Sequence, residues 1–193
     1  MEDKSSLYDM FLKAEKLWKK RKSEDEKESV VKAVKILNRI LKEDPDHVLS
    51  LILMGGILEF SKGCFQELGL SDEAQAYTKA LEYCDRALEI DPLSAEAWAC
   101  KSEILLLRIG QPAQALDAVK KGMQAFVGGS PSPEDDPKLR LWVGETLYSN
   151  KVWALAALGR EDEARETLAE GFRHYPGSKF LQETEERFLP AGN

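Results

Sequence analysis

The chain has 193 residues, of which 43% are hydrophobic and 32% are charged, and its formal net charge is −7. This composition predicts a folded, soluble protein with a sizeable core. An acidic surface repels phosphate backbones, and the longest apolar runs are too short to span a bilayer, so we expect no nucleic acid partner and no membrane insertion. The start of the chain lacks a signal peptide's apolar stretch, and no CxxC pair occurs among Cys64, Cys84 and Cys100, so we expect reduced thiols in a cytoplasmic protein.

Helical periodicity dominates the sequence. No run of Val, Ile and Thr alternates with polar residues, as a half-buried strand would require. Apolar residues at three- and four-residue spacing, together with proline and glycine stop signals, predict helices over nine ranges. In chain order these ranges are 5–21, 28–41, 47–60, 71–90, 94–109, 112–126, 137–158, 161–174 and 178–189. We therefore expect an all-α protein.

Residues typical of helix starts stand at several of these boundaries. Ser71 and Ser178 are expected to cap their helices, because a serine oxygen can accept a hydrogen bond from a backbone amide of the first turn. Pro112 suits the first position of its helix, where its missing amide hydrogen is not needed. Asp136 is the expected cap of the helix that begins at Pro137.

An internal repeat groups the helices into pairs. Residues 40–45 read ILKEDP, residues 87–92 read ALEIDP and residues 171–176 read GFRHYP, and an alanine lies seven positions before each of these segments, at Ala33, Ala80 and Ala164. Helix pairs of this kind bury their apolar surface by stacking. We expect one domain over residues 1–193, with repeats at 5–45, 46–92, 93–131 and 137–176 and a capping helix at 178–189.

These features resemble the tetratricopeptide repeat. That motif combines a large residue early in the first helix, a glycine at the turn, small residues in the second helix and a closing proline. The residues that fit it are Ala33 and Pro45 in the first repeat, Ala80, Ala87 and Pro92 in the second, Trp98, Gly110, Ala115 and Gly122 in the third, and Tyr148, Gly159, Ala164, Gly171 and Pro176 in the fourth. The resemblance implies a right-handed solenoid of about four helix pairs plus a C-terminal capping helix, although the closing prolines are farther apart than a 34-residue period.

The resemblance also implies a concave groove lined by the first helix of each repeat. Here the residues expected to line it are Leu49, Ile52, Glu59, Glu96, Ala99, Glu103, Thr146, Ser149, Asn150 and Trp153. The amide of Asn150 could bind a peptide backbone, or it could be solvated, and Trp153 could anchor a partner or fill the interior. The first hypothesis is an adaptor or scaffold that binds a peptide or helix of another protein, of neutral or basic amphipathic character.

Catalytic motifs are not found in the sequence. It contains no phosphate-binding glycine loop, no GxSxG elbow and no HExxH motif, and it has only two histidines, so we expect no enzyme activity, no cofactor and no metal. A second hypothesis is a homodimer that buries the apolar stripe of the first helix at Phe11 and Trp18. A third is a regulatory or assembly subunit of a larger complex.

Overall fold

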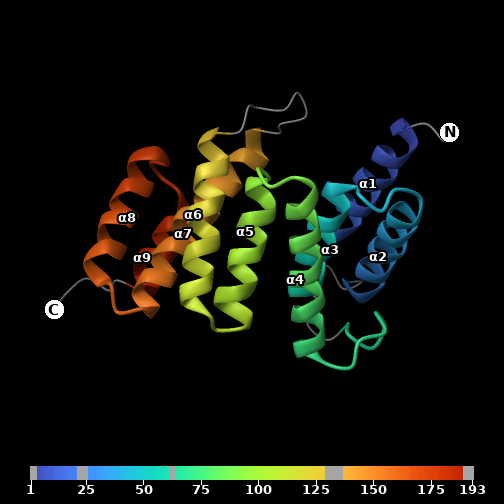
Figure 1. Ribbon diagram of the computed structural model, residues 1–193, viewed down its shortest axis with the longest axis horizontal. Coiled ribbons are helices and arrows are strands. Elements are labelled where there is room, and N and C mark those ends of the chain that lie inside the picture. The colour runs from blue at the N-terminus through green and yellow to red at the C-terminus, as the bar shows by residue number, and fades with distance from the viewer. Residues whose placement is uncertain (1–3, 21–25, 61–63, 129–136, 189–193) are drawn as a thin grey trace. The chain divides into compact units, whose positions relative to one another are not determined.

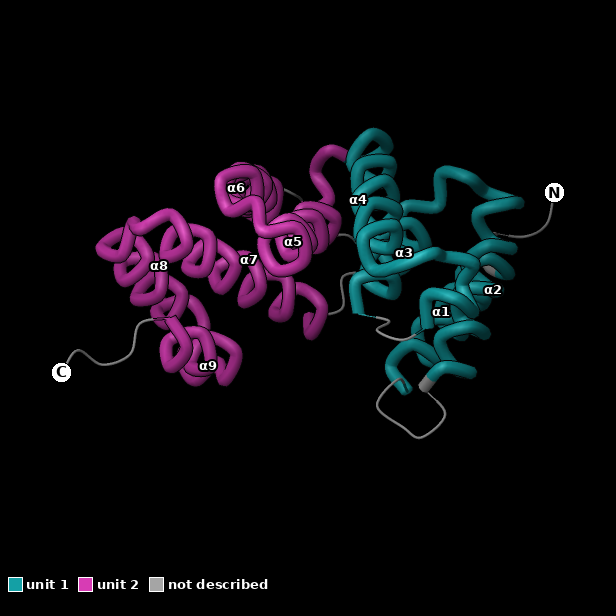
Figure 2. The backbone as a smooth tube through the Cα atoms, turned by 90° about the horizontal axis from the view of Figure 1, so that it is seen from below, with its two compact units in different colours: residues 1–91 teal, residues 92–193 magenta. Residues whose placement is uncertain are grey.

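All the regular structure found in the described parts of the chain is helical. The computed structural model describes residues 4–20, 26–60, 64–128 and 137–188, and these ranges contain nine α-helices and one π-helical turn (Figure 1). The prediction of an all-α protein is therefore confirmed. The chain divides into two compact units, residues 1–91 and 92–193 (Figure 2). The expectation that they form one domain stays a prediction.

Unit 1 contains four helices in which successive members pack on one another. They are α1 (Lys4–Lys19), α2 (Glu26–Glu43), α3 (Val48–Phe60) and α4 (Glu73–Ile90). Helix α1 packs against α2 and α3, and α3 packs along α4. Pro45 explains where α2 ends, because its ring disfavours helical geometry at Asp44.

The core of unit 1 encloses one face of α1. Ala14 and Trp18 of α1 are buried beside Leu37 of α2 and Ile57 of α3, and the half-buried Phe11 packs against this cluster. The homodimer hypothesis needs the Phe11–Trp18 stripe to face outward. That stripe is instead used within unit 1.

The N-terminus of α4 corrects one sequence prediction. Asp72, and not Ser71, is the N-cap, since its Oδ1 accepts a hydrogen bond from the Gln75 amide at 2.9 Å. Ser71 donates from its hydroxyl to Asp72 Oδ2 at 3.1 Å. These hydrogen bonds, that from Gln75 first, lower the pKa of Asp72. A carboxylate also suits the positive end of the helix dipole, which favours Asp over its serine neighbour.

Unit 2 contains five α-helices and the π-helical turn. They are α5 (Ala95–Glu103), the π turn η1 (Ile104–Arg108), α6 (Pro112–Gly128), α7 (Pro137–Ala157), α8 (Glu161–His174) and α9 (Lys179–Phe188). Two predicted helix starts are confirmed: Pro112 is the first residue of α6, and Ser178 Oγ accepts from the Leu181 amide at 3.2 Å. The predicted cap Asp136 lies outside the described residues.

The π turn coincides with an extra residue. Trp98 and Gly110 are twelve residues apart, whereas their counterparts Tyr148 and Gly159 are eleven apart. Both glycines adopt a left-handed turn conformation, with φ of 74° and 72°. The π turn Ile104–Arg108 lies between Trp98 and Gly110, and its wider winding accommodates the additional residue within the helix.

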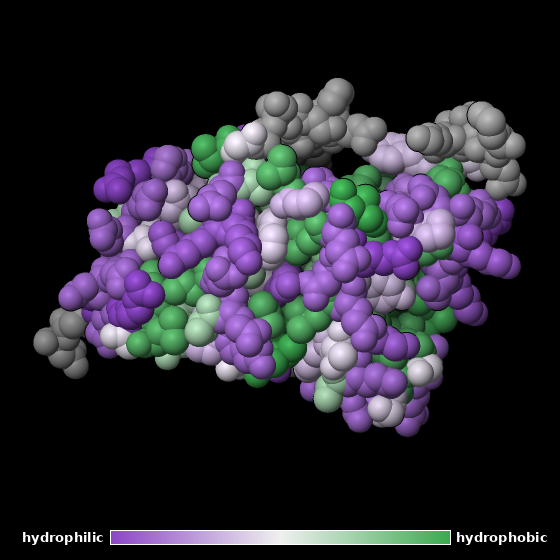
Figure 3. Space-filling model, in the orientation of Figure 1, coloured by the Kyte–Doolittle hydropathy of each residue, from purple (hydrophilic) through white to green (hydrophobic). Residues whose placement is uncertain are grey.

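Helix α7 is the central helix in the packing of unit 2. Helix α6 contacts α5 and α7, and α7 contacts α8 and α9 (Figures 1 and 2). A Cβ atom at Gly122 of α6 would lie 2.9 Å from Trp98 Cβ and 2.7 Å from Leu147 Cδ2. Glycine at this position therefore lets α6 approach both neighbouring helices. Hydrophilic residues predominate on the face drawn in Figure 3, with smaller hydrophobic areas between them.

Candidate functional site

The groove residues predicted on α3 of unit 1 differ in exposure. Leu49 and Ile52 are half-buried. Glu59 is buried, with 1% of its surface exposed. Leu49 and Ile52 are thus the members of this group with some accessible surface.

On α5 of unit 2, the two predicted carboxylates are partly accessible and Ala99 is buried. Glu96 accepts a hydrogen bond from the Ser94 hydroxyl at 3.3 Å. Burial raises the pKa of Glu103 to about 7, and the positive charge of Arg108 acts in the opposite direction. At neutral pH the Glu103 carboxyl is therefore protonated in a large fraction of molecules, which makes this face less acidic than the sequence indicates.

Asn150 has a different role from either of those considered from the sequence. Its side chain is buried, and its Nδ2 donates to Ser102 Oγ at 3.0 Å. The Ser102 hydroxyl donates in turn to the Ala99 carbonyl oxygen at 2.8 Å. Asn150 therefore connects α7 to α5 inside the core, so its amide is neither solvated nor presented to a partner.

Helix α9 covers the middle and the end of the predicted face of α7. The hydroxyls of Ser149 and Thr184 are 2.7 Å apart, and the Thr184 hydroxyl donates to the Phe180 carbonyl at 2.9 Å, so Ser149 acts as the donor to Thr184. One turn farther on, the rings of Trp153 and Phe188 lie 3.8 Å apart between centroids. Trp153 is half-buried in this contact, and it belongs to the packing between α7 and α9.

The first two turns of α7 extend beyond this cover. Ser149 meets Thr184 and Trp153 meets Phe188, both at an offset of 35 residues, so α7 and α9 run parallel. Because α9 begins at Lys179, its start is level with Gly144 of α7. Residues 137–142 of α7 therefore lie before the first turn of α9.

Large apolar side chains are exposed on these uncovered turns and at the end of α6. The exposed fractions are 85% for Val127, 37% for Leu139, 47% for Leu141 and 44% for Trp142. We call these four residues the end surface. Leu139 and Trp142 precede Thr146 at helical spacing and so continue the line that runs through Thr146, Ser149 and Trp153; these five residues are called the α7 line. An exposed apolar area of this kind is typical of a docking site for another protein.

A cation lies beside the end surface. The Arg140 guanidinium is 4.9 Å from the centre of the Phe126 ring, which ties the start of α7 to the end of α6. The sequence prediction missed the end surface, although residues 139–143 carry a signal for it. Leu139, Leu141, Trp142 and Val143 extend around more of the helix than one buried face requires, and of these only Val143 is fully buried.

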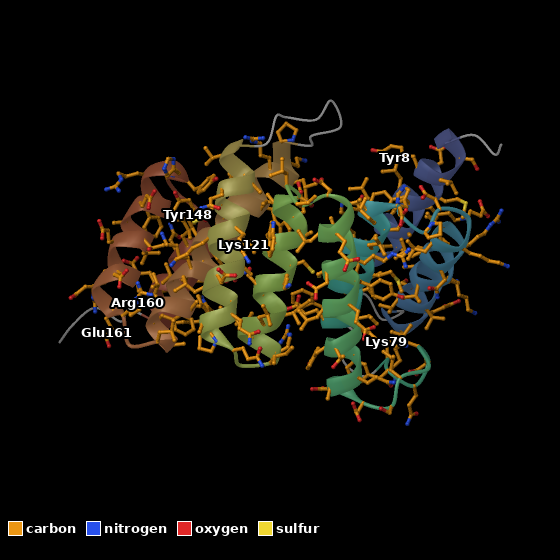
Figure 4. All side chains as sticks on the ribbon, in the orientation of Figure 1. Tyr8, Lys79, Lys121, Tyr148, Arg160 and Glu161 are labelled. Carbon is orange, nitrogen blue, oxygen red and sulfur yellow. The ribbon has the colours of Figure 1, made fainter. Side chains whose placement is uncertain are left out.

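Polar and aromatic side chains where α7 meets α8 have structural roles. Tyr148 is labelled in Figure 4. Its hydroxyl donates to Glu170 Oε1 at 3.0 Å, and its ring stacks on His174 with 5.8 Å between ring centres. Burial and the Glu170 carboxylate raise the pKa of Tyr148 to about 12. This phenol therefore keeps its proton at physiological pH and serves as a hydrogen-bond donor.

A hollow of about 350 Å³ lies between α5 and α6, with the Trp98 ring and Lys121 among the residues lining it. The Lys121 ammonium lies 5.3 Å from the centre of that ring. The same ammonium is 2.7 Å from Asp117 Oδ2. Lys101 also lines the hollow, with its ammonium 5.6 Å from the centre of the same ring.

The described parts of the chain show neither a metal site nor a membrane-spanning helix, and the three cysteines are buried. Over the described ranges, no three His, Cys, Asp or Glu side chains are grouped so as to hold a metal ion. Cys64, Cys84 and Cys100 are buried thiols. No helix in those same ranges has both the length and the apolar character of a membrane span.

Comparison with known proteins connects the fold to a family. The family model described as tetratricopeptide repeat matches residues 83–117, from the second half of α4 to the start of α6. Among solved structures, a crystal structure of MamA protein is similar at 16% sequence identity, with 94% of this chain and 98% of that chain covered and a TM-score of 0.38. The search of curated proteins gives no match. The matched segment contains Trp98, Gly110 and Ala115, which carried the resemblance in the sequence, so the chain contains a segment similar to a tetratricopeptide repeat at residues 83–117.

Proposed function

We propose that this chain is a non-catalytic scaffold that binds a segment of another protein through the end surface of unit 2. The observation that carries the proposal is the exposure of Leu139, Leu141 and Trp142 on the first helix of a repeat, together with that of Val127 at the end of α6. Apolar and aromatic side chains left open to solvent are the usual anchors of protein recognition. Tetratricopeptide repeats are protein-interaction modules, which supports the same function.

This proposal keeps only some of the residues that were predicted to line the groove. Glu96 and Glu103 on α5 keep accessible surface and are proposed as secondary contacts of a partner. Asn150 is excluded from the partner contacts, because its amide is buried and bound to Ser102. We do not propose a homodimer through Phe11 and Trp18, since that stripe packs inside unit 1.

A comparison of two variants tests the proposal. Tagged wild type, the double variant Leu139→Ser/Trp142→Ser and the control Leu158→Ser are used to capture partners from a lysate of the source cells. Leu158, the residue directly after the C-terminal end of α7, is 38% exposed and is matched in chemistry, but it lies outside the end surface. We expect partners that bind the wild type and the control to be lost from the double variant. Retention of every partner by a double variant with wild-type helix content would refute the assignment.

A further inference from the structure

We infer that α9 is an internal occupant of the α7 line, and that the partner is an amphipathic helix that takes its place and also covers Leu139 and Trp142. This inference rests on the proposed function and names the kind of partner that the same site accepts. It makes α9 an autoinhibitory element as well as a cap. The contacts between α9 and α7 carry the argument.

Few side chains attach α9 to the rest of unit 2. Leu181 and Thr184 are buried and Phe188 is half-buried, whereas the other side chains from Lys179 to Arg187 are exposed. The three attached residues follow i, i+3 and i+7 spacing, which is the pattern of an amphipathic helix lying in a groove. An element attached by so few contacts opens at a lower free-energy cost than the core of a domain.

The polar groups of the α7 line are only partly satisfied when α9 is in place. Thr146 Oγ1 and Trp153 Nε1 are buried and have no hydrogen-bond partner in the part of the chain that the structure describes. A buried polar atom without a partner costs about 1–3 kcal/mol. At the offset of 35 residues, the α9 residues level with these two atoms are Leu181 and Phe188, whose side chains carry no acceptor, so this cost stays in place and makes α9 easier to displace.

The α7 line is also longer than α9 can cover. Helix α9 starts level with Gly144, but the line continues to Trp142 and Leu139. From Leu139 to Trp153 the line spans about 21 Å at 1.5 Å per residue. A partner helix of about four turns, parallel to α7, would bury these two exposed side chains in addition to the area that α9 buries.

The partner chemistry follows from the residues it replaces. It needs large apolar residues at the positions of Leu181 and Phe188 and a small hydroxyl residue at the position of Thr184. It needs further apolar residues one and two turns upstream, opposite Trp142 and Leu139. Its charged residues would face solvent, as Glu183, Glu185 and Glu186 of α9 do.

The experiment uses the full chain and a fluorescein-labelled peptide with the sequence of residues 178–188 as a probe, with binding measured by fluorescence anisotropy. In the variant Ser149→Cys/Thr184→Cys, a disulfide can hold α9 in place, because the two native hydroxyl oxygens are only 2.7 Å apart. Leu181→Ala loosens α9 at a residue that also packs against α8 in the core of unit 2, and Phe188→Ala loosens it from the less buried end.

We expect the loosened variants to bind the probe about tenfold more tightly than the wild type, because truncation of a buried Leu or Phe weakens their own α9. We expect the oxidised double-cysteine variant to lose binding and to recover it on reduction, and a probe with scrambled sequence not to bind. Equal binding by the oxidised and reduced forms would overturn the inference, as would failure of both loosened variants to bind while they keep wild-type helix content.

The double variant Leu139→Ser/Trp142→Ser separates this inference from the proposed function. The N-terminal end of the bound probe would not extend as far as Leu139 or Trp142. The two substitutions should therefore leave the affinity for the probe unchanged. Loss of partners from that variant with unchanged probe affinity supports both statements. Retained partners would refute only the function assigned to the end surface.

Discussion

Gly122 lies where α6 passes close to α5 and α7, and replacing it with alanine tests whether packing requires glycine there. The added Cβ would lie 2.7 Å from Leu147 Cδ2 and 2.9 Å from Trp98 Cβ. Leu147 can move its terminal methyl group. The Cβ of Trp98 is bonded to the α5 backbone, and the Trp98 indole is held by a hydrogen bond from its Nε1 to the Pro92 carbonyl at 3.0 Å, so α5 itself must shift.

Two effects of opposite sign decide the result. Alanine is favoured over glycine inside a helix by about 1 kcal/mol. Overpacking of a tight core costs about 1–3 kcal/mol, and the fixed Trp98 Cβ places Gly122→Ala in the upper part of that range. We therefore expect Gly122→Ala to lower the free energy of unfolding by about 1–2 kcal/mol.

Gly56→Ala in α3 is the matched control. Nothing lies within 4 Å of the Cβ it would add, so only the helix preference remains and we expect stabilisation by about 1 kcal/mol. Denaturant unfolding followed by far-ultraviolet circular dichroism gives the midpoints and slopes of both variants. If Gly122→Ala raises the midpoint as Gly56→Ala does, the close approach of α6 does not limit this position and the reasoning is wrong.

Three further substitutions test polar groups of unit 2, each by a change in stability. Asn150→Ala removes the donor to Ser102, and we expect thermal unfolding to show a loss of about 1–3 kcal/mol; an unchanged midpoint would contradict the role of Asn150 between α5 and α7. Glu103 ionises near pH 4.5 when unfolded but only at about 7 when folded, so the stability it contributes is complete below pH 4.5 and is lost as pH rises to 7. Urea midpoints across this range should therefore fall for the wild type relative to Glu103→Gln, and parallel profiles would show that Glu103 is not buried enough to matter. Tyr148→Phe removes the hydroxyl that donates to Glu170, and chemical denaturation should reveal a loss of about 1 kcal/mol, whereas a gain would mean that this hydrogen bond does not stabilise the contact.

Short-range signals predicted most helix boundaries, because caps and prolines act over one turn. Pro112 and Ser178 stand where the structure begins α6 and precedes α9. The one-residue difference at Ser71 has a local cause too. Both Ser71 and Asp72 can cap a helix, and the carboxylate of Asp72 gains from the helix dipole in addition to its hydrogen bonds.

The functional face was harder to predict, because a first helix in a stack of repeats is buried on more than one side. The sequence pattern shows that Asn150 is polar, but it cannot show that Ser102 is near enough to accept its hydrogen bond. Similarly, the apolar spacing of α9 predicts a helix with one buried side, but it does not indicate that Thr184 and Phe188 cover Ser149 and Trp153. These contacts join residues 35 or more positions apart.

The π turn shows what residue spacing in the sequence can predict and what it cannot. One residue added to an α-helix rotates all that follows by about 100°, yet Trp98 before the insertion and Ala115 after it must both face the packing between α5 and α6. The added residue must therefore be absorbed between them, either in the turn or in the helix. Gly110 and Gly159 have nearly the same φ, and the wider π winding at Ile104–Arg108 shows that the end of the helix takes up the extra residue. A comparison of the two repeats in the sequence is enough to reveal the extra residue, but its location depends on backbone geometry that residue spacing does not contain.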